Sequence, residues 1–191
     1  MRYQAEHKAE VHQKIVKDAS RRIRTEGLTG AAVSAVMRDA GLTHGGFYKH
    51  FESKDELLME SLSESFREIT DYLVDVAEQS HSKEPWKAIV KTYLSLEFCH
   101  HVERGCPLTS LAPEMARVDK KMRGRILAEL ANYKDRMLPF MPGRRTADKE
   151  HAFFQIFSTM VGAMILARAV DDPELSDRIL SVSRKRLGRE Q

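Results

Sequence analysis

Four side chains suited to redox chemistry lie in one short segment, at Cys99, His100, His101 and Cys106. A thiolate beside a histidine can have a lowered pKa and can react with oxidants or electrophiles. Cys106 lies between a glycine and a proline, so we expect a helix break and an exposed thiol there. One hypothesis is therefore a thiol sensor at Cys99 or Cys106. The alternative is that both cysteines are inert, buried apolar side chains.

Metal binding and catalysis have weaker signals. The same four side chains have none of the ligand spacings of known zinc motifs. Glu97-x-x-His100 and Glu78-x-x-His81 match the Glu-x-x-His spacing of di-iron carboxylate bundles, but such a site needs a Glu from each of two further helices. A helical di-iron protein is thus the alternative of a different class. The sequence has no Gly-rich phosphate loop, Gly-x-Ser-x-Gly or His-Glu-x-x-His motif. It therefore predicts a protein that is not an enzyme and holds no metal or other cofactor.

Basic residues are concentrated near the N-terminus. Residues 1–51 contain nine Lys or Arg and five Asp or Glu, a net charge of +4, and four of the eight histidines. The remaining residues sum to -1. This distribution favours a nucleic-acid-binding module joined to a nearly neutral body. A solvated basic surface would give the same charge.

Periodicity places three helices in this module: residues 6–26, a short second helix, and a third over residues 43–50. Gly41 supplies the left-handed conformation that a tight turn between the last two requires, and their size is typical of a helix-turn-helix. Gly45 and Gly46 cost about 1 kcal/mol each relative to alanine in a helix. We expect DNA approaching this helix to offset that cost. A helix-turn-helix used only for protein packing is the alternative.

Residues 40–57 form a dense motif, Ala-Gly-Leu-Thr-His-Gly-Gly-Phe-Tyr-Lys-His-Phe-x-Ser-Lys-x-x-Leu. It resembles the signature of the tetracycline-repressor (TetR) family, approximately A-G-V-S-x-G-x-[LF]-Y-x-H-F-x-x-K-x-x-L, and the resemblance covers about residues 8–60. It implies a homodimeric repressor whose third helix enters the major groove of a palindromic operator on double-stranded DNA, and which a small-molecule inducer releases. A thiol-sensing regulator acting through Cys106 or Cys99 remains the alternative.

The resemblance also assigns DNA contacts. Those implied for the DNA backbone are Thr43, Gly45, Tyr48, His50 and Lys54, and those near base edges are His44, Gly46 and Lys49. Lys54 opposes the dipole of the helix that it begins, and a nearby phosphate would remove this conflict. Family members usually have Thr or Ser at the start of the second helix, where this chain has Ala31 and Ala32. Ser34, one turn later, would take over the phosphate contact.

Helical periodicity continues to the C-terminus, and no stretch alternates as a strand would. Ser53 and Glu56 form a capping-box pattern at the start of a long helix. The other expected helices run from Pro85 to about Cys99 and over about residues 108–112, 117–137, 146–170 and 173–187. We therefore expect an all-α protein of about nine helices, with a helix-turn-helix DNA-binding domain at residues 1–53 and a helical ligand-binding and dimerisation domain at residues 54–191.

The segment from Phe153 to Ala167 is apolar on more than one face. At about 15 residues it is shorter than the roughly 20 that a membrane span needs, so we expect a cytoplasmic protein without a membrane partner. A helix apolar all round is buried on both sides, by its own core and a second subunit. The alternative is a monomer with one internal helix. The predicted interface comprises Phe153, Ile156, Met160, Ala163, Met164, Ala167, Leu175, Ile179 and Val182.

The TetR resemblance implies an inducer pocket between the middle helices, and apolar and aromatic side chains typically line such sites. Residues at helical spacing serve equally as ordinary core. No cluster of buried charges is evident in the sequence, which favours an apolar, neutral ligand. The candidate lining residues are Trp86, Tyr93, Phe98, Met115, Met137, Phe154, Phe157 and Met160.

Overall fold

The computed structural model describes residues 2–30 and 32–189, and within these ranges the chain has helices and no strand. The predicted all-α class is confirmed. The α-helices are α1 (Arg2–Glu26), α2 (Val33–Asp39), α3 (Lys54–Gln79), α4 (Pro85–Tyr93), α5 (Leu96–His100), α6 (Pro107–Met115), α7 (Lys120–Met137), α8 (Thr146–Ala169) and α9 (Pro173–Arg189). The 3₁₀-helices are η1 (Leu28–Gly30), η2 (His44–Lys49), η3 (Val102–Arg104) and η4 (Leu138–Phe140).

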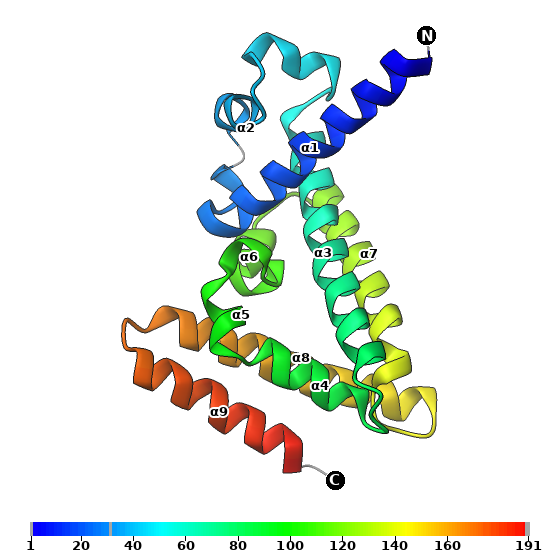
Figure 1. Ribbon diagram of the computed structural model, residues 1–191, viewed down its shortest axis with the longest axis vertical. Coiled ribbons are helices and arrows are strands. Elements are labelled where there is room, and N and C mark those ends of the chain that lie inside the picture. The colour runs from blue at the N-terminus through cyan, green and yellow to red at the C-terminus, as the bar shows by residue number, and fades with distance from the viewer. Residues whose placement is uncertain (1, 31, 190–191) are drawn as a thin grey trace.

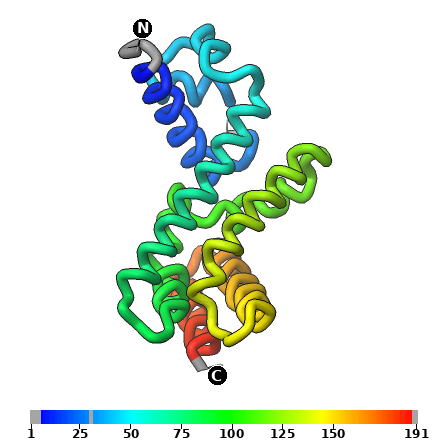
Figure 2. The backbone as a smooth tube through the Cα atoms, turned by 90° about the vertical axis from the view of Figure 1, so that its right-hand side faces the viewer, coloured from blue at the N-terminus to red at the C-terminus, as the bar shows by residue number. Residues whose placement is uncertain are grey.

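The helices form a small N-terminal body and a larger helical body below it (Figures 1 and 2). α1, α2 and η2 make up the small body. α3 leaves it and runs beside α7, while α8 and α9 lie against each other at the opposite end of the molecule (Figure 1). The long helix α3 therefore carries the chain from one body into the other.

Two hydrophobic clusters correspond to these bodies, and they share helices. In α1, Ile15 and Ala19 belong to the small cluster, whereas Ile23 belongs to the large one. In α3, Leu57 packs in the small cluster and Leu58 begins the series that packs in the large one. Because one helix face continues through both clusters, the N-terminal body is fixed to the rest of the molecule by α1 and α3. The proposed domain boundary between residues 53 and 54 therefore lies close to the point where α3 passes from the small cluster to the large one, and the packing of α3 is continuous across it.

Side-chain capping marks the start of several helices, among them α3, α5 and α7. The Ser53 hydroxyl accepts a hydrogen bond from the Glu56 backbone N–H at 3.1 Å, and the Glu56 carboxylate accepts one from the Glu52 N–H at 2.5 Å. The expected single helix from Pro85 to Cys99 is instead two. The Ser95 hydroxyl accepts a hydrogen bond from the Phe98 N–H and caps the start of α5, and α4 ends two residues before this cap, at Tyr93. The third helix of the N-terminal body is a 3₁₀-helix.

Helix α8 is longer than its apolar stretch predicts. It has 24 residues, and an 18-residue window of it has a mean hydropathy of 1.5, so by length and composition it is long enough to cross a membrane. The sequence analysis considered only the apolar stretch from Phe153 to Ala167, whereas the whole helix passes this test of length and composition. A third of that window, 33%, is buried within the chain. α8 contacts α4, α5, α6 and α9, as the core helix of a helical body does.

Gly27 ends α1 in the left-handed conformation, with φ of +80°, directly against the α6 residue Glu114. The Glu114 carboxylate accepts a hydrogen bond from the Leu28 N–H at 2.9 Å. A Cβ on residue 27 would lie 2.7 Å from Glu114 Oε1. The turn after α1 is thereby attached to a helix of the larger body.

We expect Gly27→Ala to lower the free energy of unfolding by roughly 1–2 kcal/mol, because the substitution combines a strained backbone with a displaced Glu114. Gly124→Ala is the matched control, since Gly124 is exposed within α7 and a Cβ there meets no atom within 4 Å. That control should raise stability by up to about 1 kcal/mol. Urea unfolding midpoints measure both changes. Equal midpoints for the two variants would contradict the account.

Candidate DNA-binding site

The turn between α2 and η2 is held by Gly41 and backbone hydrogen bonds. Gly41 has φ of +76°, its N–H donates to the Arg38 carbonyl, and the Leu42 N–H donates to the Met37 carbonyl at 2.7 Å. Phe47 and Phe51 are buried and stack with ring centroids 5.4 Å apart. These apolar contacts fix η2 against α1 and α2, so its remaining side chains face outward.

The outward-facing side chains include most of the predicted DNA contacts. Tyr48 is 72% exposed although it is aromatic. Lys49 beside it is also exposed, and Lys54 is the first residue of α3. We call the nine predicted contacts the recognition surface: seven are exposed, Gly46 and His50 are half-buried, and the full set is Ser34, Thr43, His44, Gly45, Gly46, Tyr48, Lys49, His50 and Lys54.

Gly45 and Gly46 are not required by the fold. Neither has a positive φ. A Cβ on Gly45 would meet no atom within 4 Å, and one on Gly46 would make ordinary contacts with Met37 at 3.6 Å and Thr43 at 3.9 Å. The protein itself would accommodate alanine at both positions. The space above them is therefore free for a binding partner.

The start of α2 has no side-chain cap. Ala32 is in the N-cap position and makes no side-chain hydrogen bond, as its methyl group dictates. Ala31 lies outside the described residues. Ser34 is exposed on the first turn of α2, where its hydroxyl is free to contact a phosphate. The start of α2 thus lacks the hydroxyl cap that is usual in the family whose motif the sequence resembles.

Two histidines support the recognition surface from behind. The His12 ring stacks on Phe51 with centroids 4.5 Å apart, and its Nε2 lies 2.6 Å from a Glu60 carboxylate oxygen. His50 Nδ1 is buried without a hydrogen-bond partner. Burial lowers the pKa of His50, and the nearby His12 and Lys8 lower it further. This lowered pKa disfavours the protonated form of His50 and so weakens it as a cation for phosphate. The sequence analysis did not include His12 or Glu60.

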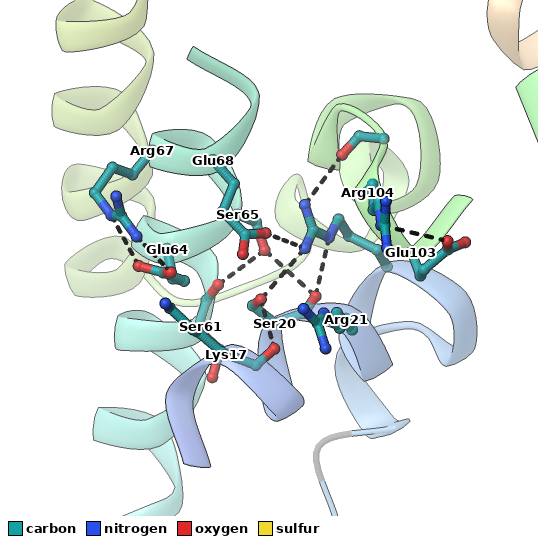
Figure 3. A network of polar contacts seen from close by, with 12 residues as sticks. Lys17, Ser20, Arg21, Ser61, Glu64, Ser65, Arg67, Glu68, Glu103 and Arg104 are labelled. Atoms are coloured by element: carbon teal, nitrogen blue, oxygen red, sulfur yellow. Dashed lines mark hydrogen bonds and ion pairs between the residues drawn. The ribbon is translucent and has the colours of Figure 1, made fainter. Parts of the chain in front are cut away.

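A buried arginine joins α1 to the larger body. Arg24 is fully buried, its Nη2 donates to Glu68 of α3 at 2.5 Å, and its Nη1 donates to the Gly105 carbonyl at 3.4 Å. Nε and Nη2 also donate to the Ser20 carbonyl and hydroxyl. We call Ser20, Arg24, Glu68 and Gly105 the junction network. Figure 3 shows Ser20 of α1 facing Ser65 and Glu68 of α3 in this region.

The predicted pocket residues are not gathered around one cavity. Phe98 lines a cavity of about 780 Å³ whose other walls are largely polar, and Trp86 lines another of about 480 Å³. Phe154 is exposed, and Phe157 is half-buried against Tyr133. The remaining four are buried in the hydrophobic core: Tyr93, Met115, Met137 and Met160.

Both cysteines are buried, with exposures of 5% for Cys99 and 1% for Cys106. The expected exposure of Cys106 is wrong, because the thiol lies beneath α6 beside the Tyr93 hydroxyl. Burial raises the pKa of Cys106, which disfavours the reactive thiolate. Across the part of the chain that the structure describes, no three His, Cys, Asp or Glu side chains form a group able to hold a metal ion.

The predicted dimer residues divide into buried and exposed sets. Six residues of α8 are buried within the subunit's own core: Phe153, Ile156, Met160, Ala163, Met164 and Ala167. Ile179 of α9 is half-buried, and Leu175 and Val182 are exposed. Three α8 residues outside the predicted set are exposed: Phe154, Ile165 and Leu166. The outer apolar face of α8 and α9 therefore consists of Phe154, Ile165, Leu166, Leu175 and Val182.

A helix-turn-helix with an exposed basic recognition surface, continued by a helical body, is the arrangement of a DNA-binding transcriptional regulator. The family model for bacterial regulatory proteins of the tetR family matches residues 15–60. The N-terminal domain is a TetR-type DNA-binding domain, as its motif predicts. No curated protein has detectable sequence similarity to the chain.

Solved structures extend the likeness to the whole fold. A TetR transcriptional regulator from Chloroflexus aurantiacus J-10-FL has a TM-score of 0.74 at 20% identity, covering 97% of this chain and 98% of that one. A TetR-family regulator from Cytophaga hutchinsonii has a TM-score of 0.75 at 16% identity, covering 95% of each chain. The reduced form of Escherichia coli NemR has a TM-score of 0.68 at 16% identity, covering 93% of this chain and 95% of that one.

Proposed function

We propose that the protein is a homodimeric repressor that binds a palindromic operator and is released from it by a small molecule. The observation that carries the DNA-binding part is the glycine pair within a basic recognition surface, of which Gly45 is exposed and Gly46 half-buried. Neither glycine is needed for the backbone or for internal packing. A helix that must approach a duplex closely accounts for both, since side chains there would hold the backbone away from the phosphates and base edges.

The outer apolar face of α8 and α9 supports a dimer. Its five large apolar side chains are exposed on two helices that pack against each other. A second copy of the chain would bury this face and place two recognition surfaces on one side of the pair. Two-fold symmetry of this kind matches a palindrome with half-sites about one helical turn apart.

A chain of contacts that runs from α8 through the segment around Gly105 to α1 supports regulation. Arg168 of α8 donates to the Phe98 and Cys99 carbonyls and to the Thr109 hydroxyl. A Cβ on Gly105 would lie 2.7 Å from Arg168, and the Gly105 carbonyl accepts from Arg24 of α1. A ligand that moves this segment would therefore shift α1 and change the spacing of the two recognition surfaces.

The test is fluorescence anisotropy with labelled DNA from upstream of the protein's own gene, over a salt series. We expect Tyr48→Ala/Lys49→Ala to weaken binding by about 100-fold, because each lost contact is worth roughly 1–3 kcal/mol. Lys120→Ala removes the same charge from the exposed start of α7 and should change little. Stoichiometric titration should give two chains per operator. Equal binding of both variants, and equal binding to scrambled DNA, would overturn the proposal.

Should that upstream region hold no operator, selection of bound fragments from genomic DNA supplies the target for the same comparison. Recovery of no common sequence would count against the proposal. The thiol-sensing alternative has less structural support, because both cysteines are buried. The same proposal places the protein in the cytoplasm, as a regulator without catalytic activity.

A further inference from the structure

A cavity of about 780 Å³ lies where the DNA-binding domain meets the larger body. Its walls come from α1, α3, α4, α5 and η3, so it touches both sides of the junction. The lining residues that matter to the argument are Arg21, Glu68, Tyr72, Lys91, Phe98 and Arg104. Figure 3 shows Arg21, Glu68 and Arg104 gathered from three different elements at this junction.

Cationic groups predominate on the rim. Arg21 and Arg104 make only long ion pairs within the described residues, each at 3.9 Å, to Asp18 and Glu103 respectively. Lys91 is exposed. The other titratable lining residues are Glu68, which is half-buried, and Tyr72, Glu97 and His101, which are exposed.

The carboxylate of Glu68 does not balance these cations, because it is already paired with buried Arg24 at 2.5 Å. Among the described lining residues, Arg21, Lys91 and Arg104 supply three positive charges, and Glu97 is the one carboxylate that is not in the Arg24 pair. An anion entering the cavity would find an excess of positive charge. Such an anion could accept charge-assisted hydrogen bonds from the guanidinium and ammonium groups.

One wall is aromatic. Tyr72 is 47% exposed, which is unusual for a large ring beside a hydrophobic core. Its ring is parallel to that of Phe98, with an interplanar angle of 3° and centroids 6.3 Å apart. Phe98 is in turn supported by Tyr93, whose ring centroid is 4.9 Å away. A rigid aromatic wall of this kind suits the apolar body of a small ligand.

We propose that this cavity binds a small organic anion, with its carboxylate or sulfonate at Lys91 and Arg104 and its apolar body against Tyr72 and Phe98. The inference rests on the proposed function, in that a small molecule regulates DNA binding, and it assigns that ligand a charge. It replaces the neutral ligand expected from the sequence. Because Arg21 and Glu68 line the same cavity, the bound anion acts next to the junction network that positions α1.

The experiment uses two fluorescent probes that share an anilinonaphthalene body. The anionic probe is 8-anilinonaphthalene-1-sulfonate, and the neutral probe is N-phenyl-1-naphthylamine. Each is titrated into the full-length protein without DNA. We expect Lys91→Met/Arg104→Met to weaken binding of the sulfonate by about tenfold or more and to leave binding of the neutral probe unchanged. Both side chains are exposed, so the fold should persist, as thermal melting checks.

Arg117→Met/Lys120→Met is the matched control, because it removes the same charge from an exposed region away from the cavity. It should leave sulfonate binding unchanged. Ala88→Trp fills the cavity and should abolish binding of both probes. The proposal is overturned if the two double variants bind the sulfonate equally, or if Ala88→Trp still binds it, since the probe then occupies the outer apolar face of α8 and α9.

The two proposals can be tested separately, because a variant can lose operator binding and keep probe binding, or the reverse. Tyr48→Ala/Lys49→Ala should lose operator binding and keep charge-dependent sulfonate binding. Charge-dependent binding in a protein that recognises no operator would overturn the proposed function and leave the anion site standing. Operator binding with charge-independent probe binding would overturn the anion site alone.

Discussion

Replacing Gly45 and Gly46 together by alanine should leave the protein folded and weaken operator binding by at least about tenfold. The added methyl groups meet no obstacle within the chain, so nothing in the folded protein opposes them. Alanine also lowers the conformational entropy of the unfolded chain, and stability should rise by roughly 0.4–1 kcal/mol per site. The loss of affinity arises because the methyl groups occupy the space that the duplex must enter.

Urea unfolding and fluorescence anisotropy on the same preparations measure the two effects. Gly188→Ala is the matched control, because Gly188 lies near the end of α9 and a Cβ there also meets no atom within 4 Å. The control should bind the operator as the unmodified protein does. If the double variant is more stable and keeps full affinity, the glycines have no role in DNA binding, and the recognition surface must lie elsewhere.

Arg24→Met should cost about 3 kcal/mol of unfolding free energy, which for a chain of this length lowers Tm by about 10 °C. The substitution leaves the Glu68 carboxylate without its partner, and the Gly105 carbonyl loses a donor. Arg24→Lys keeps the charge but loses the planar fork that contacts Ser20 and Glu68 together. Its effect should be intermediate.

Arg21→Met is the control for this series, because Arg21 is the neighbouring basic residue on α1 and its side chain is 51% exposed. That change should alter stability by less than about 0.5 kcal/mol. Scanning calorimetry on all three variants gives the comparison. Equal melting temperatures for Arg24→Met and Arg21→Met would show that the buried ion pair adds nothing to the attachment of α1.

The fold follows from the sequence where a local signal decides it. Gly41 predicts the turn because only glycine adopts its backbone conformation without cost. Ser53 predicts the start of α3 through a side-chain hydrogen bond. The division of the 85–99 segment was missed because apolar residues continue at helical spacing across it, and a single serine cap outweighs that pattern.

The regulatory parts depend on packing that spacing does not reveal. Helix α8 is apolar on nearly every side, so periodicity does not distinguish the face toward its own core from the outer one. Cys106 has turn-forming neighbours, and its burial results from the helices around it. Arg24 has a signal in hindsight, since it lies one helical turn after the buried Ser20, on a side of α1 where a charge must find a partner.

The continuity of α1 and α3 through both hydrophobic clusters has a consequence for cooperativity. Eight buried residues form the small cluster, and several of them lie on helices whose other ends are fixed in the larger body. Opening the small cluster alone would require breaking α1 in mid-helix and freeing the first turn of α3, which holds Leu57. Slow amide exchange should therefore extend without interruption along both helices, and the two bodies should unfold in one transition. Any ligand that stabilises the larger body then protects the DNA-binding domain from proteolysis as well.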